Sequence, residues 1–368
     1  MNKKFRYEGI DLLRIISMLM VVVLHILGIG GVIENTVENT SNYYISNFME
    51  HFCFCAVNLY ALITGFVYIK ATYRFHKIVS LWCEVFFYSF LITIIFLLLP
   101  GFNISKINII YGLIPITSSR YWYFTSYFCL FLLIPFLNKA INNMSQLLHK
   151  RIVFIGFILF GVISLIGSFV GCYDIFKLED GYSAIWLMYL YIVGAYIKLY
   201  YRRNLYKKKV YFIIYLCSVF ANFFFDMCVI YVKKHVYSKL PNVTLQIYNS
   251  PFIIIASIAL FLLFVDLHFS KGKSIINIFS SVSFSVYLIS VHPVLFYEFQ
   301  KSIFNSYASM SSGLLVLSVV ISAVAIYIVC SLIGYIQKQL FKLIKIDLLS
   351  QKIVNIGKRL LNKVHIKS

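Results

Sequence analysis

The chain has 368 residues, of which 61% are hydrophobic and 12% are charged, against about 45–50% and about 25% in soluble domains. This composition excludes an ordinary soluble domain with one apolar core. The hydrophobic residues form separate runs of about 18–24 residues, each long enough to cross a hydrocarbon layer about 30 Å thick. The polar stretches between them are too short for a second soluble domain, and the first run lacks the cleavage site of a secretory signal.

The net charge of +20 at pH 7 would suggest a nucleic-acid partner if the protein were soluble. In a membrane protein, basic residues in short loops instead face the anionic inner leaflet. We therefore expect the lipid bilayer as a partner and no nucleic acid. The eight Cys have no metal-ligand spacing, so we expect them to fill space between helices, and we expect no metal site.

In chain order, the apolar runs predict an all-α, polytopic membrane bundle of about ten transmembrane helices. A membrane-embedded domain would occupy residues 1–336, and 337–368 would form a basic amphipathic cytoplasmic tail on the membrane surface. The predicted spans are 10–29, 52–69, 78–99, 121–138, 152–171, 183–201, 210–232, 248–266, 275–297 and 313–336.

Ten spans would place both ends of the chain on the same side of the membrane. With these spans, 25 basic residues fall on the side of the termini and seven on the other side. The positive-inside rule then predicts that both ends are cytoplasmic, in a multi-pass protein of the cell (cytoplasmic) membrane. Lys233, Lys234 and Lys239 oppose this assignment locally, because they place three positive charges in a predicted outer loop.

The first span carries two ionisable residues in its apolar run, Arg14 and His25. They are 11 residues apart, close to three turns of a helix, so they share one face and lie about 16 Å apart along its axis. Asp11 precedes Arg14 by three residues, within reach of an ion pair. Because charge in lipid is costly, this stripe is a candidate functional site. The alternative is structural, with Arg14 reaching the inner headgroups and His25 bonding another helix.

Three residues around the second span are further candidates. Glu50 would lie where the first span emerges, and it either orients or charges His25 or is a solvated loop carboxylate. Arg74 and Lys77 follow the second span on the predicted cytoplasmic side. Such a basic pair can hold phosphates through charge-assisted hydrogen bonds, or it can merely follow the positive-inside rule.

Four more polar residues lie within or beside later spans. Tyr123 opens the fourth span, where an aromatic belt is expected at the outer interface. His292 precedes a proline near the outer end of span nine and is either structural or functional. For Glu84 and Asp226, inside spans three and seven, we expect structural hydrogen bonds.

Five segments in order resemble the acyltransferase-3 family of membrane proteins, which modify surface polysaccharides and related acceptors. Two positions depart from the family pattern: Lys77 replaces an arginine, and Ser290 stands where the family often has histidine, which leaves open whether His292 substitutes for it. The segments are 7–25 with its Arg-x10-His spacing, 57–66 like the second span "FFxISGF", Arg74-x-x-Lys77 like RxxR, 122–138 like the fourth span, and 284–293 like "GxYLIHxxP".

The resemblance implies O-acyl transfer, usually of acetyl, from cytoplasmic acyl-CoA to a hydroxyl of an exported or lipid-linked glycan or glycolipid. Acetyl-CoA would be a donor substrate, and no bound cofactor is implied. Arg74, Lys77 and Arg14 would hold the donor's phosphates. His25 would activate the acceptor hydroxyl or carry the acyl group transiently.

Two other classes of membrane protein act on glycans without this chemistry. A glycan flippase or transporter predicts a continuous polar lining through several spans, and outside span one only Glu84 and Asp226 lie well inside. A glycan polymerase predicts a long outer loop with Arg and acidic residues. The longest predicted outer loop has Glu34 and Glu38 but no Arg or Lys.

Overall fold

The computed structural model describes residues 7–102, 104–202, 205–269, 271–296 and 301–365, and within them it contains helices and connecting segments but no strand. The helices are α1 (Glu8–Leu27), α2 (Ser41–Cys53), α3 (Ala56–Tyr68), α4 (His76–Leu98), α5 (Ile107–Leu113), α6 (Trp122–Asn142), α7 (Gln146–Gly156), η1 (Phe157–Ile163), α8 (Ser164–Phe169), η2 (Glu179–Gly181), α9 (Ala184–Tyr200), α10 (Lys208–His235), α11 (Pro251–Val265), α12 (Lys273–Ser281), α13 (Ser283–Ser290), α14 (Pro293–Leu295), α15 (Lys301–Phe304), η4 (Asn305–Ser309), α16 (Ser312–Leu343) and α17 (Ile346–His365).

Among the described residues, seven helices are long and apolar enough to cross a membrane, and the bent pair α12–α13 would make an eighth. The seven correspond to predicted spans one to five, seven and ten. Predicted spans six and eight are the shorter apolar helices α9 and α11, of 17 and 15 residues. An all-helical, multi-pass membrane fold is thus confirmed. The count of ten and the cytoplasmic side of the termini stay predictions.

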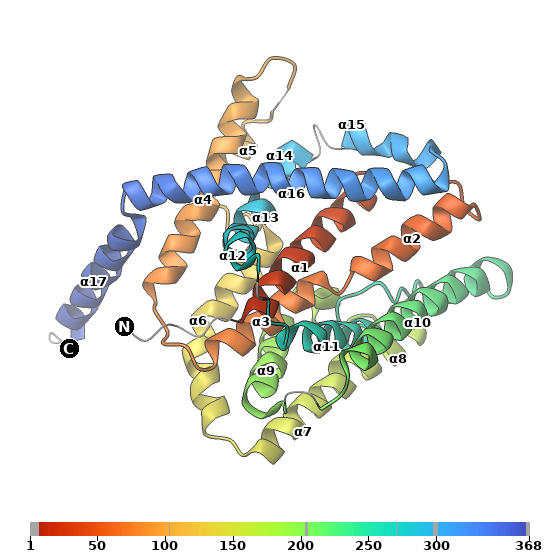
Figure 1. Cartoon of the computed structure of the whole chain (residues 1–368), viewed down its shortest axis with the longest axis horizontal. Helices are drawn as coiled ribbons and strands as arrows, with labels where there is room; N and C mark the ends of the chain where they lie inside the picture. Colours follow the sequence, from red (N-terminus) through yellow and green to blue (C-terminus); the bar gives the residue numbers. More distant parts are fainter. Residues whose placement is uncertain (1–6, 103, 203–204, 270, 297–300, 366–368) are drawn as a thin grey trace.

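The helix that carries the predicted stripe lies at the centre of the bundle. α1 packs against α2, α3, α11, α12, α13 and α16, and α16 crosses one side of the bundle while α7 to α11 form the other (Figure 1). Side chains on α1 therefore meet residues from distant parts of the chain.

α3 and α9 approach so closely that two positions admit no side chain. A Cβ atom at Gly65 would lie 2.1 Å from the carbonyl oxygen of Tyr191, and one at Gly194 would lie 2.2 Å from that of Leu62. The two glycines therefore bring the helix backbones into contact, as small residues do between membrane helices.

The predicted ninth span is not one continuous helix. Its described part breaks at Val282 into α12 and α13, which meet at an angle of 41°. Ser280, Ser281 and Ser283 lie around the break, and the hydroxyl of Ser283 lies 3.2 Å from that of Tyr327 on α16. Non-helical backbone at membrane depth is tolerated where protein or a cavity surrounds it. Residue 297 of this span lies outside the described residues.

The C-terminal segment is helical but starts later than expected. α16 continues to Leu343, beyond the predicted boundary at 336, and α17 follows after a sharp turn. The turn is made by Lys345, whose φ of 55° is left-handed. α17 then packs against α4 and α16, so the tail helix is docked on the bundle.

Candidate functional site

A cavity of about 790 Å³ extends along α1, and we call it the main cavity. Arg14, Met18, Val21 and His25 all line it. Their spacing of four, three and four residues places them on one face of the helix. The prediction that Arg14 and His25 share a face is thus confirmed, and both side chains face the same space.

The other walls of the main cavity come mostly from aromatic residues of α3, α6, α13 and neighbouring loops. Trp122 and Tyr248 belong to this aromatic wall, and the lining also includes Tyr68, Leu81 and Ser281. A concave, largely apolar space with a few convergent polar groups is the usual form of a small-molecule site. The main cavity is therefore the candidate active site.

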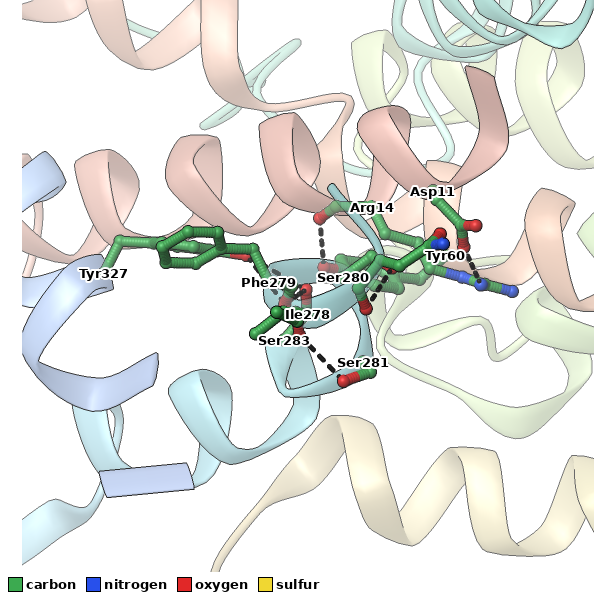
Figure 2. A network of polar contacts seen from close by, with 10 residues as sticks. Asp11, Arg14, Tyr60, Ile278, Phe279, Ser280, Ser281, Ser283 and Tyr327 are labelled. Atoms are coloured by element: carbon green, nitrogen blue, oxygen red, sulfur yellow. Dashed lines mark hydrogen bonds and ion pairs between the residues drawn. The ribbon is translucent and has the colours of Figure 1, made fainter. Parts of the chain in front are cut away.

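Arg14 is held by contacts on both its side chain and its backbone (Figure 2). Its Nη1 donates to Oδ1 of the buried Asp11 at 2.9 Å, which confirms the predicted ion pair. The hydroxyl of Tyr60 donates to the Arg14 carbonyl at 2.7 Å. The Arg14 side chain remains 30% exposed, so the guanidinium is positioned by Asp11 and is still open to a ligand.

His25 has one ring nitrogen bound to its own helix. Nδ1 lies 2.6 Å from the carbonyl oxygen of Val21. Because a carbonyl only accepts, Nδ1 carries the hydrogen in this contact and Nε2 keeps its lone pair in the neutral ring. The ring also packs edge-on against Phe296, with centroids 5.7 Å apart. His25 is thus oriented as a proton acceptor beside the main cavity.

Two further predicted residues line the main cavity. Glu50 lies beside Gly28, one turn beyond His25, since its Oε1 is 3.5 Å from where a Cβ at Gly28 would be. Tyr123 also lines the cavity, and its buried hydroxyl has no hydrogen-bond partner among the described residues. Both side chains therefore face the main cavity, and their roles toward a substrate stay predictions.

The predicted phosphate pair is split by the structure. Lys77 lines a second cavity, described below, where its Nζ lies 2.9 Å from Oδ2 of Asp347 on α17. Arg74 is exposed and lines neither of these two cavities. The two residues therefore do not converge on one site, and their roles in holding the donor stay predictions.

His292 is placed behind the wall of the main cavity. It is fully buried, and its Nε2 lies 3.2 Å from the Ser89 carbonyl and 3.3 Å from Nη2 of Arg120. Neither His292 nor Ser290 lines the main cavity, although Val291 and Pro293 do. Its buried Nδ1 has no hydrogen-bond partner among the described residues, so the choice between a structural and a functional role for His292 stays a prediction.

The two acids that the sequence places inside spans three and seven, the half-buried Glu84 and the buried Asp226, are hydrogen-bonded, as expected. Glu84 accepts from the Ser285 hydroxyl at 2.8 Å. Asp226 accepts from the backbone N–H of Leu245 at 2.7 Å and lies 3.5 Å from Nε2 of His51. Among the described residues, no group of three or more His, Cys, Asp or Glu side chains is arranged to hold a metal ion.

Two features of the main cavity are not among the residues predicted from the sequence. Arg120 lines it and donates to the Thr93 hydroxyl at 2.9 Å; an arginine directly before an apolar span was the available signal. The serines at the α12–α13 break also line it (Figure 2). Four serines within 280–285 were a signal that this span is interrupted.

The chain matches one protein-family model over most of its length. The acyltransferase-3 family model, described as an acyltransferase domain, matches residues 7–335. The match spans α1 to nearly the end of α16 and includes every residue named above as lining the main cavity. No curated protein and no solved structure matches the chain.

Proposed function

This chain belongs to the acyltransferase-3 family, and we propose that it is an O-acyltransferase of the cell membrane. It moves an acyl group, most simply acetyl, from cytoplasmic acyl-CoA to a hydroxyl of an exported or lipid-linked glycan. The observation that carries the proposal is that Arg14 and His25, two costly polar residues of one apolar helix, open onto the same cavity. Acyl-CoA is the donor substrate, and the proposal requires no bound cofactor.

His25 supplies the proton chemistry of the transfer. With Nδ1 bound to the Val21 carbonyl, Nε2 accepts the proton of the acceptor hydroxyl as its oxygen attacks the thioester carbonyl. The new C–O ester bond forms, the C–S bond breaks, and the proton passes to the departing CoA thiolate. The same Nε2 is also the atom that would carry the acyl group in a two-step route.

Arg14 acts on a different part of the donor. By helix geometry it lies about 16 Å from His25 along the axis, too far for both side chains to contact the reacting carbonyl. Its guanidinium is fixed by Asp11 and faces the main cavity near the start of α1. We therefore assign Arg14, with Asp11 as its positioning residue, to holding the donor.

The aromatic wall of the main cavity is suited to a sugar acceptor. The rings of Trp122 and Tyr182 have centroids 4.4 Å apart, and those of Tyr182 and Tyr248 are 4.9 Å apart. Such faces pack against the C–H faces of a sugar ring, while Glu50 can accept hydrogen bonds from its hydroxyls. In this proposal Glu50 orients the acceptor or His25, and Tyr123 contacts the acceptor.

A glycan flippase without covalent chemistry is the second candidate. A direct experiment separates the two: purified protein in nanodiscs is incubated with labelled acetyl-CoA and a glycan acceptor. We expect label to appear on the glycan, with a mass increase of one acetyl group. Glycan translocation by protein in liposomes without any label transfer would reject the transferase and favour the flippase.

A further inference from the structure

A second cavity, of about 690 Å³, lies between α4, the α12–α13 break and the corner where α16 turns into α17. We call it the basic cavity. Its charged side chains carry a net positive charge, because four lysines face two carboxylates. They are Lys77, Lys338, Lys342 and Lys345, with Glu84 and Asp347.

The basic cavity already holds one anionic group of the chain itself. The carboxylate of Asp347 accepts from Lys77 Nζ at 2.9 and 3.1 Å and from the Ser80 hydroxyl at 2.8 Å. An ammonium and a hydroxyl that converge on two carboxylate oxygens can donate equally to phosphate oxygens. The position of Asp347 thus marks where an anionic ligand can bind.

Two lysines of the basic cavity form no ion pair within the part of the chain that the structure describes. Lys342 and Lys345 have no carboxylate partner among the described residues. The last turn of α16 favours a cation at Lys342 through the helix dipole. Lys345, however, lies beyond the end of that helix. Its φ of 55° is left-handed, and non-glycine residues rarely adopt this conformation.

The basic cavity adjoins the main cavity. Tyr68, Leu81 and Ser281 line both, and Arg14 and His25 line the main cavity as well. A ligand with phosphates at one end and a reactive group on a flexible arm can therefore place the phosphates among the lysines and extend its arm toward His25. A coenzyme A thioester has this form.

We propose that the basic cavity binds the nucleotide phosphates of the acyl donor, and that Lys342 and Lys345 are their principal ligands. This inference rests on the proposed function and adds residues of the α16–α17 corner to the donor site. Gln337, which is 5% exposed, and Phe341 also line the basic cavity. An amide and an aromatic face are groups that recognise a nucleobase.

The competing ligand is an anionic lipid, since its headgroup is also a phosphate ester. The test therefore uses unacylated coenzyme A as the probe and protein in nanodiscs of either neutral or anionic lipid. The variants are Lys342→Gln, Lys345→Gln and the pair together. The matched control is Lys352→Gln with Lys358→Gln, two exposed lysines of α17 that do not line the basic cavity.

In neutral nanodiscs, we expect coenzyme A to bind about tenfold more weakly to the Lys342/Lys345 double variant, and equally well to the control. Asp347→Asn removes the competing carboxylate, so we expect binding about threefold tighter. This opposite shift cannot come from misfolding. The double variant should elute as one peak in size-exclusion chromatography, like the wild type.

Unchanged coenzyme A affinity in the double variant would overturn the proposal. So would a loss of response to anionic lipid with coenzyme A binding intact, because the lysines would then be a lipid site. If the wild type binds coenzyme A through these lysines but transfers no acyl group, the site stands and the proposed function fails. If it transfers acetyl and the lysine variants bind donor normally, the proposed function stands and the site fails.

Discussion

The main cavity and the basic cavity meet at Tyr68, Leu81 and Ser281, yet their charged residues come from opposite kinds of sequence. Arg14 and His25 lie inside an apolar helix at the centre of the bundle. The lysines of the basic cavity lie at helix ends and in the tail. A charge inside a span is costly and therefore conspicuous, whereas a lysine at a helix end is ordinary. One site is thus visible in the sequence and the other is not.

This difference between the two cavities predicts that residues of the main cavity carry out the acyl transfer, whereas residues of the basic cavity bind the phosphates of the donor. The largest effect should come from His25→Gln, because a side-chain amide nitrogen has no lone pair that can accept the proton that Nε2 of His25 takes. We expect acetyl transfer to fall at least about 100-fold, the usual contribution of a general base. The measurement is the turnover number of the purified variant at saturating acetyl-CoA.

The matched control for His25 is His235→Gln, an exposed histidine at the end of α10. It should leave the turnover number unchanged. Coenzyme A affinity should also be unchanged in His25→Gln. A His25→Gln protein that is present in the membrane at the normal level and acylates the glycan at the wild-type rate would remove the main cavity as the place of catalysis.

Substitution of Arg14 tests whether this residue of the main cavity binds the donor or acts at the reacting carbonyl. Arg14→Gln removes the guanidinium that pairs with Asp11, and a hydrogen bond to a charged group contributes about 1.5–3 kcal/mol. We expect KM for acetyl-CoA to rise about tenfold or more, with a smaller change in the turnover number. Steady-state kinetics with Asp11→Asn alongside measure the contribution of positioning. A lost turnover number with unchanged KM would place Arg14 at the reacting carbonyl instead.

The wall behind the main cavity depends on the contact of α3 with α9. Gly194→Ala places a Cβ within 2.2 Å of the Leu62 carbonyl, so the helices must separate, at a cost of about 1–3 kcal/mol. We expect a lower thermal unfolding midpoint of the detergent-solubilised protein. Gly313→Ala is the control, because nothing lies within 4 Å of its Cβ. Equal midpoints for the two variants would refute the close packing.

The smallest effect concerns the docking of α17. Burial raises the pKa of Asp347, but hydrogen bonds from Lys77 and Ser80 outweigh it and leave the pKa below its ordinary value of 3.8. The ion pair therefore stabilises docking above pH 3.8, and this contribution is lost as the pH falls through the lower folded-state pKa. Since the Asp347 side chain is 60% exposed, the effect should be below about 1 kcal/mol.

Amide hydrogen exchange of α17, compared at each pH between the wild type and Lys77→Gln, measures this contribution. The difference in protection between the two proteins should be present at neutral pH and vanish in acid. A difference that persists below the folded-state pKa would mean that Lys77 stabilises α17 by some contact other than its pair with Asp347.

The sequence alone determined what depends on local patterns. Apolar runs specify the membrane helices, and the 3.6-residue period of a helix places Arg14 and His25 on one face and Asp11 within reach of Arg14, whatever surrounds them. These predictions hold because they need no knowledge of the neighbouring helices.

Only the tertiary structure decided which other residues join them. Glu50 reaches the main cavity, His292 is buried behind its wall, and Lys77 turns to Asp347, about 270 positions away in the chain. Each outcome depends on how helices far apart in sequence pack. The type of a residue indicates the free-energy cost of placing it in lipid, but it does not indicate which side chains surround it. The serines within 280–285 are a sequence signal for the break at Val282, but which cavities these serines line depends on the assembled bundle.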